Sequence, residues 1–147
     1  MKKIAVIGTG YVGLVTGTCF AETGNQVICV DIDEEKVEKM KQGIVPIYEP
    51  NLDTYFERNI SNGRLKFTSS LEEGIEDAEI IFLALPTPPG EDGSADLSYI
   101  LGVAEQLGKL INDFKVIVYK YVSLIFFQFL RLVVEGINKL KNWSESL

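Results

Sequence analysis

Three glycines near the start of the chain constrain its fold more than any other feature. Gly8, Gly10 and Gly13 follow a short β-branched run and precede a stretch of helical length. In a strand–turn–helix unit, the first glycine permits a tight turn, the second lets a diphosphate approach the backbone, and the third allows close packing of helix on strand. The N–H groups that open this helix would face the phosphates with the positive end of its dipole. We therefore predict a phosphate-binding turn here.

The rest of the chain alternates apolar runs with helical patterns. The predicted strands are at residues 4–7, 27–30, 65–67, 80–85 and 116–119. The predicted helices are at residues 11–23, 34–41, 52–60 and 97–110, and Asp96 is the expected N-cap of the last one. Strands that alternate with helices form parallel sheets through right-handed crossovers. The pattern therefore predicts an α/β fold with a Rossmann-like, doubly wound, mainly parallel sheet of about five strands.

Asp31 stands 18 residues after Gly13, at the end of the second predicted strand. A carboxylate there accepts charge-assisted hydrogen bonds from the ribose hydroxyls of an adenosine. It would repel a 2′-phosphate, and Ile32 and Asp33 follow it instead of an arginine. These features favour NAD over NADP as the ligand. Asp31 would alternatively cap the next helix, but Asp33 is better placed for that role.

Two further residues have two interpretations each. Thr87 lies between Pro86 and Pro88, just beyond the fourth predicted strand. Ligands of open α/β sheets bind at the carboxyl ends of the strands, so Thr87 is a candidate contact. A rigid turn that ends the strand explains its position equally well. Tyr11, inside the glycine turn, is either a cofactor contact or a packing residue.

Composition excludes several classes of function. The net charge is −7 and no basic cluster occurs, which argues against nucleic acid or an anionic membrane as partner. No histidine is present, so the chain lacks an imidazole base and a histidine metal site. Cys19 and Cys29 lie in apolar stretches without metal-ligand or redox spacing, and we predict that both are buried free thiols. The N-terminus lacks signal-peptide features, so the expected compartment is the cytoplasm.

Five motifs, in order and spacing, resemble one family. They are Gly-Tyr-Val-Gly-Leu-Val-Thr-Gly (10–17), Val-Asp-Ile-Asp (30–33), Pro-Ile-Tyr-Glu-Pro (46–50), Asn-Gly-Arg-Leu with Phe-Thr (62–68) and Asp-Gly-Ser-Ala-Asp-Leu (92–97). Together they resemble the N-terminal domain of the bacterial UDP-glucose 6-dehydrogenases, within the UDP-glucose/GDP-mannose dehydrogenase family, over residues 1–120. GDP-mannose and UDP-N-acetylmannosamine dehydrogenases share this architecture, and the motif at 46–50 favours the UDP-glucose branch.

The resemblance implies a reaction and a set of contacts. The reaction is the oxidation of UDP-glucose to UDP-glucuronate by two NAD molecules, through a thioester on a cysteine. The implied cofactor contacts are Val12, Asp31, Lys36 and Thr87, together with the glycine turn that contains Tyr11. Without the resemblance, Lys36 would be interpreted as an exposed charge on a helix.

The chain departs from the family at several positions. Asn51 stands where the family usually has glycine, which asparagine replaces tolerably because it adopts left-handed conformations. Pro86 replaces a frequent glycine. After Lys120, Tyr-Val-Ser-Leu (121–124) replaces the family's Ser-Thr-Val-Pro loop. We therefore hypothesise a truncation or frameshift near residue 120, which leaves the sheet incomplete at its C-terminal edge.

The expected organisation is an NAD-binding domain over residues 1–120 and a tail outside the family over residues 121–147. Apolar residues at helical spacing predict an amphipathic helix in this tail, which either packs on the open sheet or stays disordered. Charged residues interrupt the one candidate membrane span. We expect no catalytic residue and no metal site in the chain.

Two classes of function remain open at this point. The first is an enzyme by descent, in which the chain supplies only the cofactor domain and UDP-glucose is a partner of the intact family protein alone. The second is a non-catalytic nucleotide-binding or interaction module. Another nucleotide-sugar dehydrogenase is the alternative within the first class, and a homodimer is one assembly left open.

Overall fold

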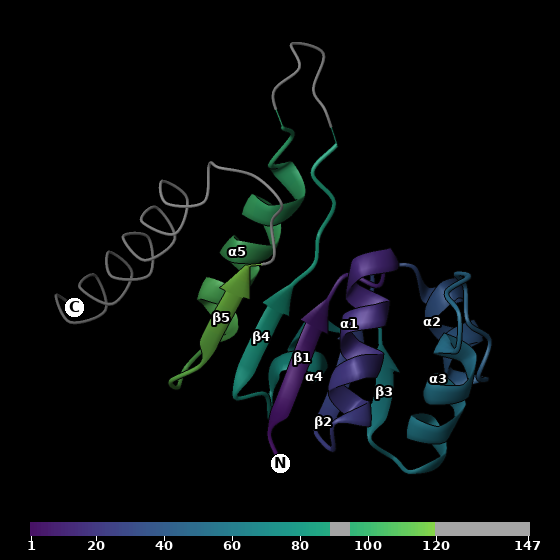
Figure 1. The fold of residues 1–147 in the computed structure, drawn as a ribbon. Coiled ribbons are helices and arrows are strands. Elements are labelled where there is room, and N and C mark those ends of the chain that lie inside the picture. The colour runs from purple at the N-terminus through teal and green to yellow at the C-terminus, as the bar shows by residue number, and fades with distance from the viewer. Residues whose placement is uncertain (89–94, 120–147) are drawn as a thin grey trace, which may run out of the picture. The chain divides into compact units, whose positions relative to one another are not determined.

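The computed structural model describes residues 1–88 and 95–119, and these residues contain five strands and five helices (Figure 1). The strands are β1 (Lys3–Ile7), β2 (Gln26–Val30), β3 (Leu65–Thr68), β4 (Ile80–Leu83) and β5 (Val116–Tyr119). The helices are α1 (Tyr11–Glu22), α2 (Glu34–Lys41), α3 (Leu52–Ser61), α4 (Leu71–Ile75) and α5 (Ser98–Leu110). The predicted α/β fold is confirmed.

All five strands are parallel, in the order β3-β2-β1-β4-β5. The register places Ile7 beside Val30 and Leu83, so the carboxyl ends of the three central strands meet at one edge. The chain moves outward from β1 to β3 on one side, and from β4 to β5 on the other side. The strand order therefore reverses next to β1, which is where open α/β sheets bind ligands.

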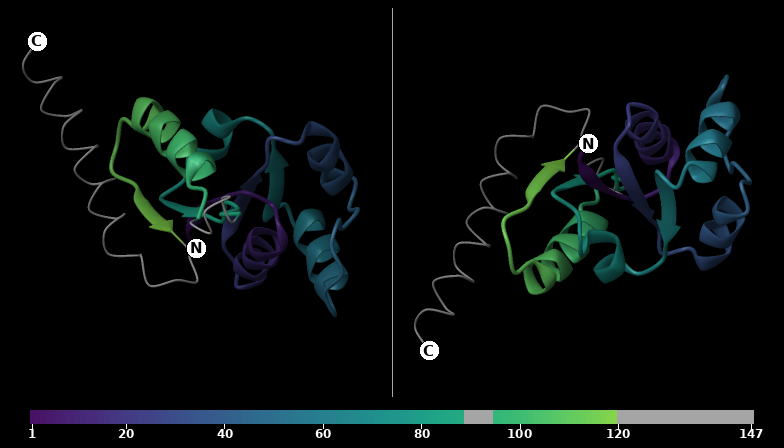
Figure 2. Two further views of the ribbon diagram at one scale, coloured as in Figure 1. Left: turned by 90° about the horizontal axis from the view of Figure 1, so that it is seen from above. Right: turned by 90° about the horizontal axis from the view of Figure 1, so that it is seen from below.

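Helices cover both faces of this sheet. Successive side chains of a strand point to opposite faces, so Cys29 and Val30 of β2 mark the two sides. A Cβ atom added to Gly17 of α1 would lie 2.6 Å from Cys29 Sγ, and one added to Gly74 of α4 would lie 2.2 Å from Val30 Cγ2. Helices α1 and α4 thus pack on opposite faces, as Figure 2 shows from above and below.

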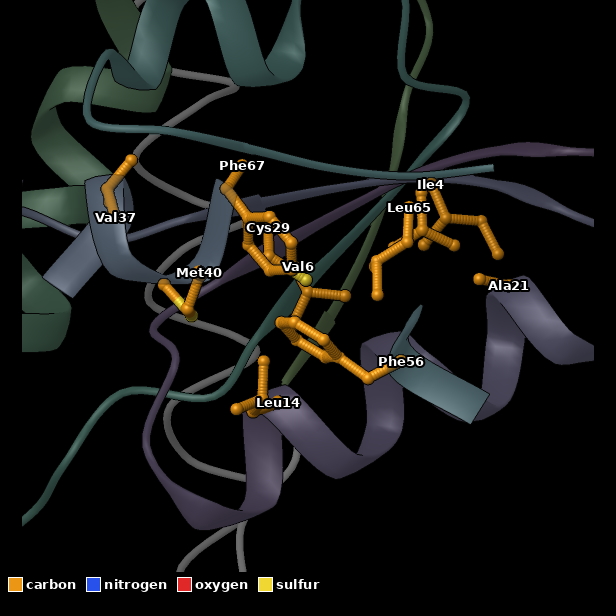
Figure 3. Packing of buried hydrophobic residues seen from close by; sticks show 11 residues of the cluster. Ile4, Val6, Leu14, Ala21, Cys29, Val37, Met40, Phe56, Leu65 and Phe67 are labelled. Atoms are coloured by element: carbon orange, nitrogen blue, oxygen red, sulfur yellow. The ribbon is translucent and has the colours of Figure 1, made fainter. Parts of the chain in front are cut away.

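The main core lies on the α1 face of the sheet (Figure 3). Its members come from β1, β2 and β3 and from the three helices α1, α2 and α3. They are Ile4, Val6, Leu14, Ala21, Val27, Cys29, Val37, Met40, Phe56, Leu65 and Phe67. Phe56 of α3 stacks on Phe67 of β3 with 5.2 Å between ring centroids. This packing fixes the strand ends that carry the candidate site.

The chain divides into two compact units. The first contains the whole sheet, in residues 1–86 and 114–119. The described residues of the second are 87–88 and 95–113, which include α5. We predicted that Asp96 caps this helix, but α5 begins at Ser98 with Leu97 as N-cap, and Asp96 Oδ1 accepts the Ser98 N–H at 2.9 Å.

The other elements follow the predictions closely, with two differences. The fourth strand ends at Leu83, two residues earlier than expected. Helix α4 was not predicted, although Ser70 caps it by accepting the Glu73 N–H.

The two cysteines differ in burial. Cys29 is buried as expected, but Cys19 is exposed, so its predicted burial was wrong. Helix α1 turns Gly13, Leu14, Gly17, Thr18 and Ala21 toward the core, and Cys19 lies outside that set.

Asn51 adopts the left-handed conformation that its position requires. Its φ is 66° and its ψ is 0°, directly before α3. Asparagine tolerates this region better than most residues do, so the replacement of the family's usual glycine is accommodated as expected. The predicted helix in the tail lies outside the described residues, as does the chain end beyond residue 119.

Candidate nucleotide-binding site

The glycine turn joins β1 to α1 and is held rigidly. Gly8 has a φ of 95°, its N–H donates to Val30 O at 2.8 Å, and a Cβ atom there would lie 2.7 Å from Ala84 O. A Cβ atom on Gly13 would lie 1.9 Å from Gly8 O. The turn and the first turn of α1 therefore touch backbone to backbone, which only glycine permits at these two positions.

Gly10 differs from the other two glycines of the turn. A Cβ atom there would meet nothing within 4 Å, and its φ of −64° is accessible to any residue. Packing against the described residues therefore does not explain a glycine at this position. A ligand that approaches the backbone closely does explain it, because a side chain would occupy the ligand's place.

The start of α1 carries unsatisfied hydrogen-bonding capacity. Gly10 is the N-cap, it makes no side-chain cap, and no acidic residue lies in the first turn. The first N–H groups of a helix lack partners within the helix, and the helix dipole makes that end positive. Tyr11 and Val12 are the first two helical residues and are exposed. An anion is the natural partner for this end.

Asp31 lies beside the glycine turn, directly after β2. Its Oδ2 accepts hydrogen bonds from Thr9 N at 3.0 Å, from Lys36 Nζ at 2.9 Å and from the Thr9 hydroxyl. Its Oδ1 accepts one from Asp33 N at 3.2 Å. The carboxylate of Asp31 thus faces the glycine turn. The prediction that Asp33 caps α2 is confirmed, since Asp33 Oδ1 accepts the Lys36 N–H at 3.0 Å.

The surroundings of Asp31 keep it charged. Partial burial by itself would raise its pKa, but the hydrogen bonds from Thr9, Lys36 and Asp33 outweigh burial and lower the pKa below its usual value. The Lys36 ammonium contacts this carboxylate directly, with 26% of its side chain exposed against 15% for Asp31. A charged carboxylate at this position accepts hydroxyl groups and repels phosphate.

Tyr11 makes a contact that the sequence did not reveal. Its hydroxyl donates to a carboxylate oxygen of Glu49, in the loop before α3. This hydrogen bond, with burial and the nearby negative charge as lesser causes, raises the pKa of the Tyr11 phenol. Tyr11 thus ties the start of α1 to the Pro-Ile-Tyr-Glu-Pro loop.

Thr9 is a residue of the site that sequence reasoning missed. It is completely buried and bonds Asp31 through both its N–H and its hydroxyl. The glycine pattern leaves this position variable, so spacing alone carries no signal for it. Its polar side chain inside an otherwise apolar strand–turn sequence was the one available clue.

The predicted contacts differ in how the structure bears on them. Gly8, Gly10, Tyr11, Val12 and Gly13 form one turn, and Asp31 and Lys36 lie beside it. Thr87 is half-buried and belongs to the second compact unit, so its contact with a cofactor stays a prediction.

Reactive groups are scarce in the described part of the chain. Burial raises the pKa of the Cys29 thiol to about 12, so it is a poor nucleophile. Among residues 1–88 and 95–119, no cluster of three or more cysteine or carboxylate side chains is placed to hold a metal ion. No helix within these ranges is long and apolar enough to cross a membrane.

Comparison with known proteins agrees with this geometry. The sequence model of the UDP-glucose/GDP-mannose dehydrogenase family, NAD binding domain, matches residues 2–135. The chain is 52% identical over 120 residues to UDP-glucose 6-dehydrogenase TuaD of Bacillus subtilis, covering 82% of this chain and 26% of the relative. It is 53% identical over 118 residues to a UDP-glucose 6-dehydrogenase of Pseudomonas aeruginosa, covering 80% and 26%. The chain therefore spans about a quarter of the length of these curated relatives.

Solved structures give the same result. A GDP-mannose dehydrogenase from Pseudomonas aeruginosa superposes with a TM-score of 0.86 at 29% identity, over 95% of this chain and 32% of that one. A UDP-glucose dehydrogenase from Pyrobaculum islandicum superposes with a TM-score of 0.83 at 35% identity, over 92% and 33%. The chain belongs to the UDP-glucose/GDP-mannose dehydrogenase family and corresponds to its NAD-binding domain.

Proposed function

We propose that the chain binds NAD at the carboxyl edge of its sheet and serves as the cofactor half of a UDP-glucose 6-dehydrogenase. The observation that carries this proposal is that Gly10 and Asp31 lie at the same end of the sheet, on the two sides of Thr9. The space beside Gly10 and the uncapped start of α1 suit a diphosphate, and the adjacent Asp31 carboxylate suits a ribose.

Each proposed contact has a distinct role. The N–H groups of Tyr11, Val12 and Gly13 donate to the diphosphate, which Gly8 and Gly10 allow to approach. Asp31 accepts a hydroxyl of the adenosine ribose, and Lys36 neutralises part of the negative charge beside it. The family resemblance adds Thr87 to the proposed cofactor contacts. Bound NAD would supply the hydride acceptor of the reaction.

The proposed substrate of the whole protein is UDP-glucose. Both curated relatives described above carry the name UDP-glucose 6-dehydrogenase and share about half of the aligned residues with this chain. We propose that the catalytic cysteine and the sugar-binding domain lie in the portion of the family protein that this chain does not span. A homodimer and a cytoplasmic location stay predictions.

Calorimetric titration of the 147-residue chain with NAD and with NADP tests the cofactor proposal. We expect NAD to bind, NADP to bind more weakly, and Asp31→Asn to weaken NAD by tenfold or more, since a charge-assisted hydrogen bond contributes about 1.5–3 kcal/mol. Asp77→Asn is the matched control, because Asp77 precedes β4, at the opposite edge, where it pairs with Lys3 at 3.2 Å. No NAD binding, or equal binding of both dinucleotides, would refute the proposal.

The alternative function is a nucleotide-binding module without catalysis. The observation in its favour is that burial raises the pKa of the Cys29 thiol to about 12, which makes this cysteine a poor nucleophile. Incubation with UDP-glucose and NAD distinguishes the two uses of the chain. We expect no NADH from this chain alone, and NADH formation would show that it carries catalytic groups of its own.

A further inference from the structure

We propose that Thr9 is a positioning residue, which holds Oδ2 of Asp31 through its N–H and its hydroxyl and leaves Oδ1 for a ribose hydroxyl of the ligand. This inference rests on the proposed function, because it concerns how Asp31 is presented to the adenosine. The cofactor contacts inferred from the sequence motifs do not include the Thr9 side chain.

Burial shows that Thr9 acts through Asp31. Thr9 has no exposed surface, so its side chain is out of reach of a ligand. Asp31 keeps 15% of its side chain exposed and accepts both hydrogen bonds from Thr9. Both polar groups of Thr9 converge on the same carboxylate oxygen. Two hydrogen bonds from one residue fix the orientation of the carboxylate as well as its position.

The count of hydrogen bonds assigns different tasks to the two oxygens. A carboxylate oxygen offers about two lone pairs. Oδ2 already has three donors, namely the Thr9 N–H, the Thr9 hydroxyl and the Lys36 ammonium. Within residues 1–88 and 95–119, Oδ1 has one donor, the Asp33 N–H, at the longer distance of 3.2 Å. The unused capacity of the carboxylate is therefore on Oδ1.

Among the donors to Oδ2, Thr9 is the fixed one and Lys36 the movable one. Thr9 belongs to the turn that Gly8 and Gly13 clamp against the backbone. Lys36 reaches Asp31 through a flexible four-carbon chain that is partly exposed. A second ribose hydroxyl would displace Lys36 from Oδ2 without disturbing Thr9. The Thr9 contacts thus persist in both arrangements.

Thr18 offers a matched comparison within the same chain. It is also completely buried, but its hydroxyl donates to Leu14 O of its own helix at 2.8 Å. Thr18→Val therefore removes a buried hydroxyl without touching the site. Thr9→Val makes the same chemical change beside Asp31. Differences between the two variants report on Asp31 and not on the general cost of removing a buried hydroxyl.

The first measurement needs no ligand. The pKa of the Asp31 carboxyl is followed by carbon NMR in the full chain; the one charged side chain that the structure shows bonded to it is Lys36 of α2. We expect Thr9→Val to raise this pKa, because a hydrogen bond to the charged form is lost, and Thr18→Val to leave it unchanged. Thr9→Ser, which keeps the hydroxyl, should retain the wild-type value. Thr9→Ala replaces Thr9→Val if the valine variant does not fold.

The second measurement is calorimetry with NAD and with its analogue that lacks the adenosine 2′-hydroxyl. We expect Thr9→Val to weaken NAD about tenfold and the analogue much less, and the loss of NAD affinity on acidification to begin at higher pH. An unchanged Asp31 pKa, or equal losses for both ligands, overturns the positioning role. Failure of the wild-type chain to bind NAD overturns the proposed function instead, which the ligand-free titration separates from the role of Thr9.

Discussion

Helices α1 and α2 both begin at the carboxyl edge of the sheet, but their first turns are capped in opposite ways. At α2, Asp33 caps the Lys36 N–H, and Glu34 and Glu35 occupy the first turn. At α1, Gly10 provides no side chain, and the first turn contains no acidic residue. The two starts thus share the sheet edge and the polarity of the backbone but not the partners of their N–H groups.

The difference shows which helix end the protein satisfies by itself. Helix α2 neutralises its positive end with its own carboxylates, and α4 follows the same solution with Ser70, Glu72 and Glu73. Helix α1 leaves its end to water or to a bound anion. A capping side chain at α1 would fill the space that we propose for the diphosphate. Helix α1 therefore gains no stability from a side-chain cap, and its buried face packs against the core.

The largest expected effect comes from inserting a methyl group into the backbone contact between the glycine turn and α1. Gly13→Ala places a Cβ atom 1.9 Å from Gly8 O, a backbone atom that cannot move freely. We expect a loss of about 3 kcal/mol in the free energy of unfolding, measured by urea denaturation. Gly102→Ala in α5 is the control, because it meets nothing within 4 Å and should be neutral or slightly stabilising. Equal stability of both variants would contradict the tight contact.

The next effect comes from giving α1 the cap that α2 has. Gly10→Asp is compatible with the backbone, since the φ of −64° at Gly10 is close to the −81° at Asp33. We expect stability to change by less than about 1 kcal/mol. NAD affinity, by calorimetry, should fall about hundredfold, because the new carboxylate fills the space and repels the diphosphate. Gly10→Ser should lie between, as a cap without charge. Undiminished affinity in Gly10→Asp would place the diphosphate elsewhere.

A smaller effect is expected from removing the caps that the protein does use. Asp33→Ala and Ser70→Ala should each cost about 1 kcal/mol of unfolding free energy, since each leaves a helix N–H without its partner. NAD affinity should stay close to wild type in both, because the Asp33 N–H that bonds Asp31 belongs to the backbone. A large loss of NAD binding in Asp33→Ala would point to α2 as the ligand-binding helix end.

The smallest effect concerns acid. Burial raises the pKa of Asp31, but its hydrogen bonds lower this pKa by more than burial raises it. The pKa in the folded protein therefore lies below the value in the unfolded chain. Asp31 therefore contributes stability that is present above the usual aspartate pKa of about 4 and is lost as pH falls through the folded pKa. Urea unfolding at about pH 5 and about pH 3 should show a smaller difference in Asp31→Asn than in wild type. An equal difference would mean that these hydrogen bonds do not favour the charged form.

The sequence predicted those parts of the site that depend on local spacing. Gly8, Gly10 and Gly13 are read directly from their intervals, and Asp31 from its place at a strand end. Lys36 came only through the family resemblance, because its contact with Asp31 depends on how α2 leaves β2. Thr9 was missed, since its hydrogen bonds join the turn after β1 to the residue after β2, and no interval along the chain records them.

Errors in the fold have similar causes. Helix α1 is apolar on several sides, so its sequence does not indicate which side meets the sheet, and the exposure of Cys19 was missed. Helix α4 has five residues, too few to show a helical repeat, although Ser70 and Glu73 have the spacing of a capping box. The contact of Tyr11 with Glu49 joins segments 38 residues apart and follows from tertiary structure alone.

Because Gly17 packs closely against Cys29, the reactivity of the two cysteines reports whether α1 is packed on the sheet. Cys29 is sealed between α1 and the sheet, whereas Cys19 on the outer side of the same helix is open to solvent. An alkylating reagent should therefore modify one sulfur rapidly and reach the other only when α1 lifts away. The ratio of singly to doubly modified chains in a mass spectrum would report such openings, without any knowledge of the ligand.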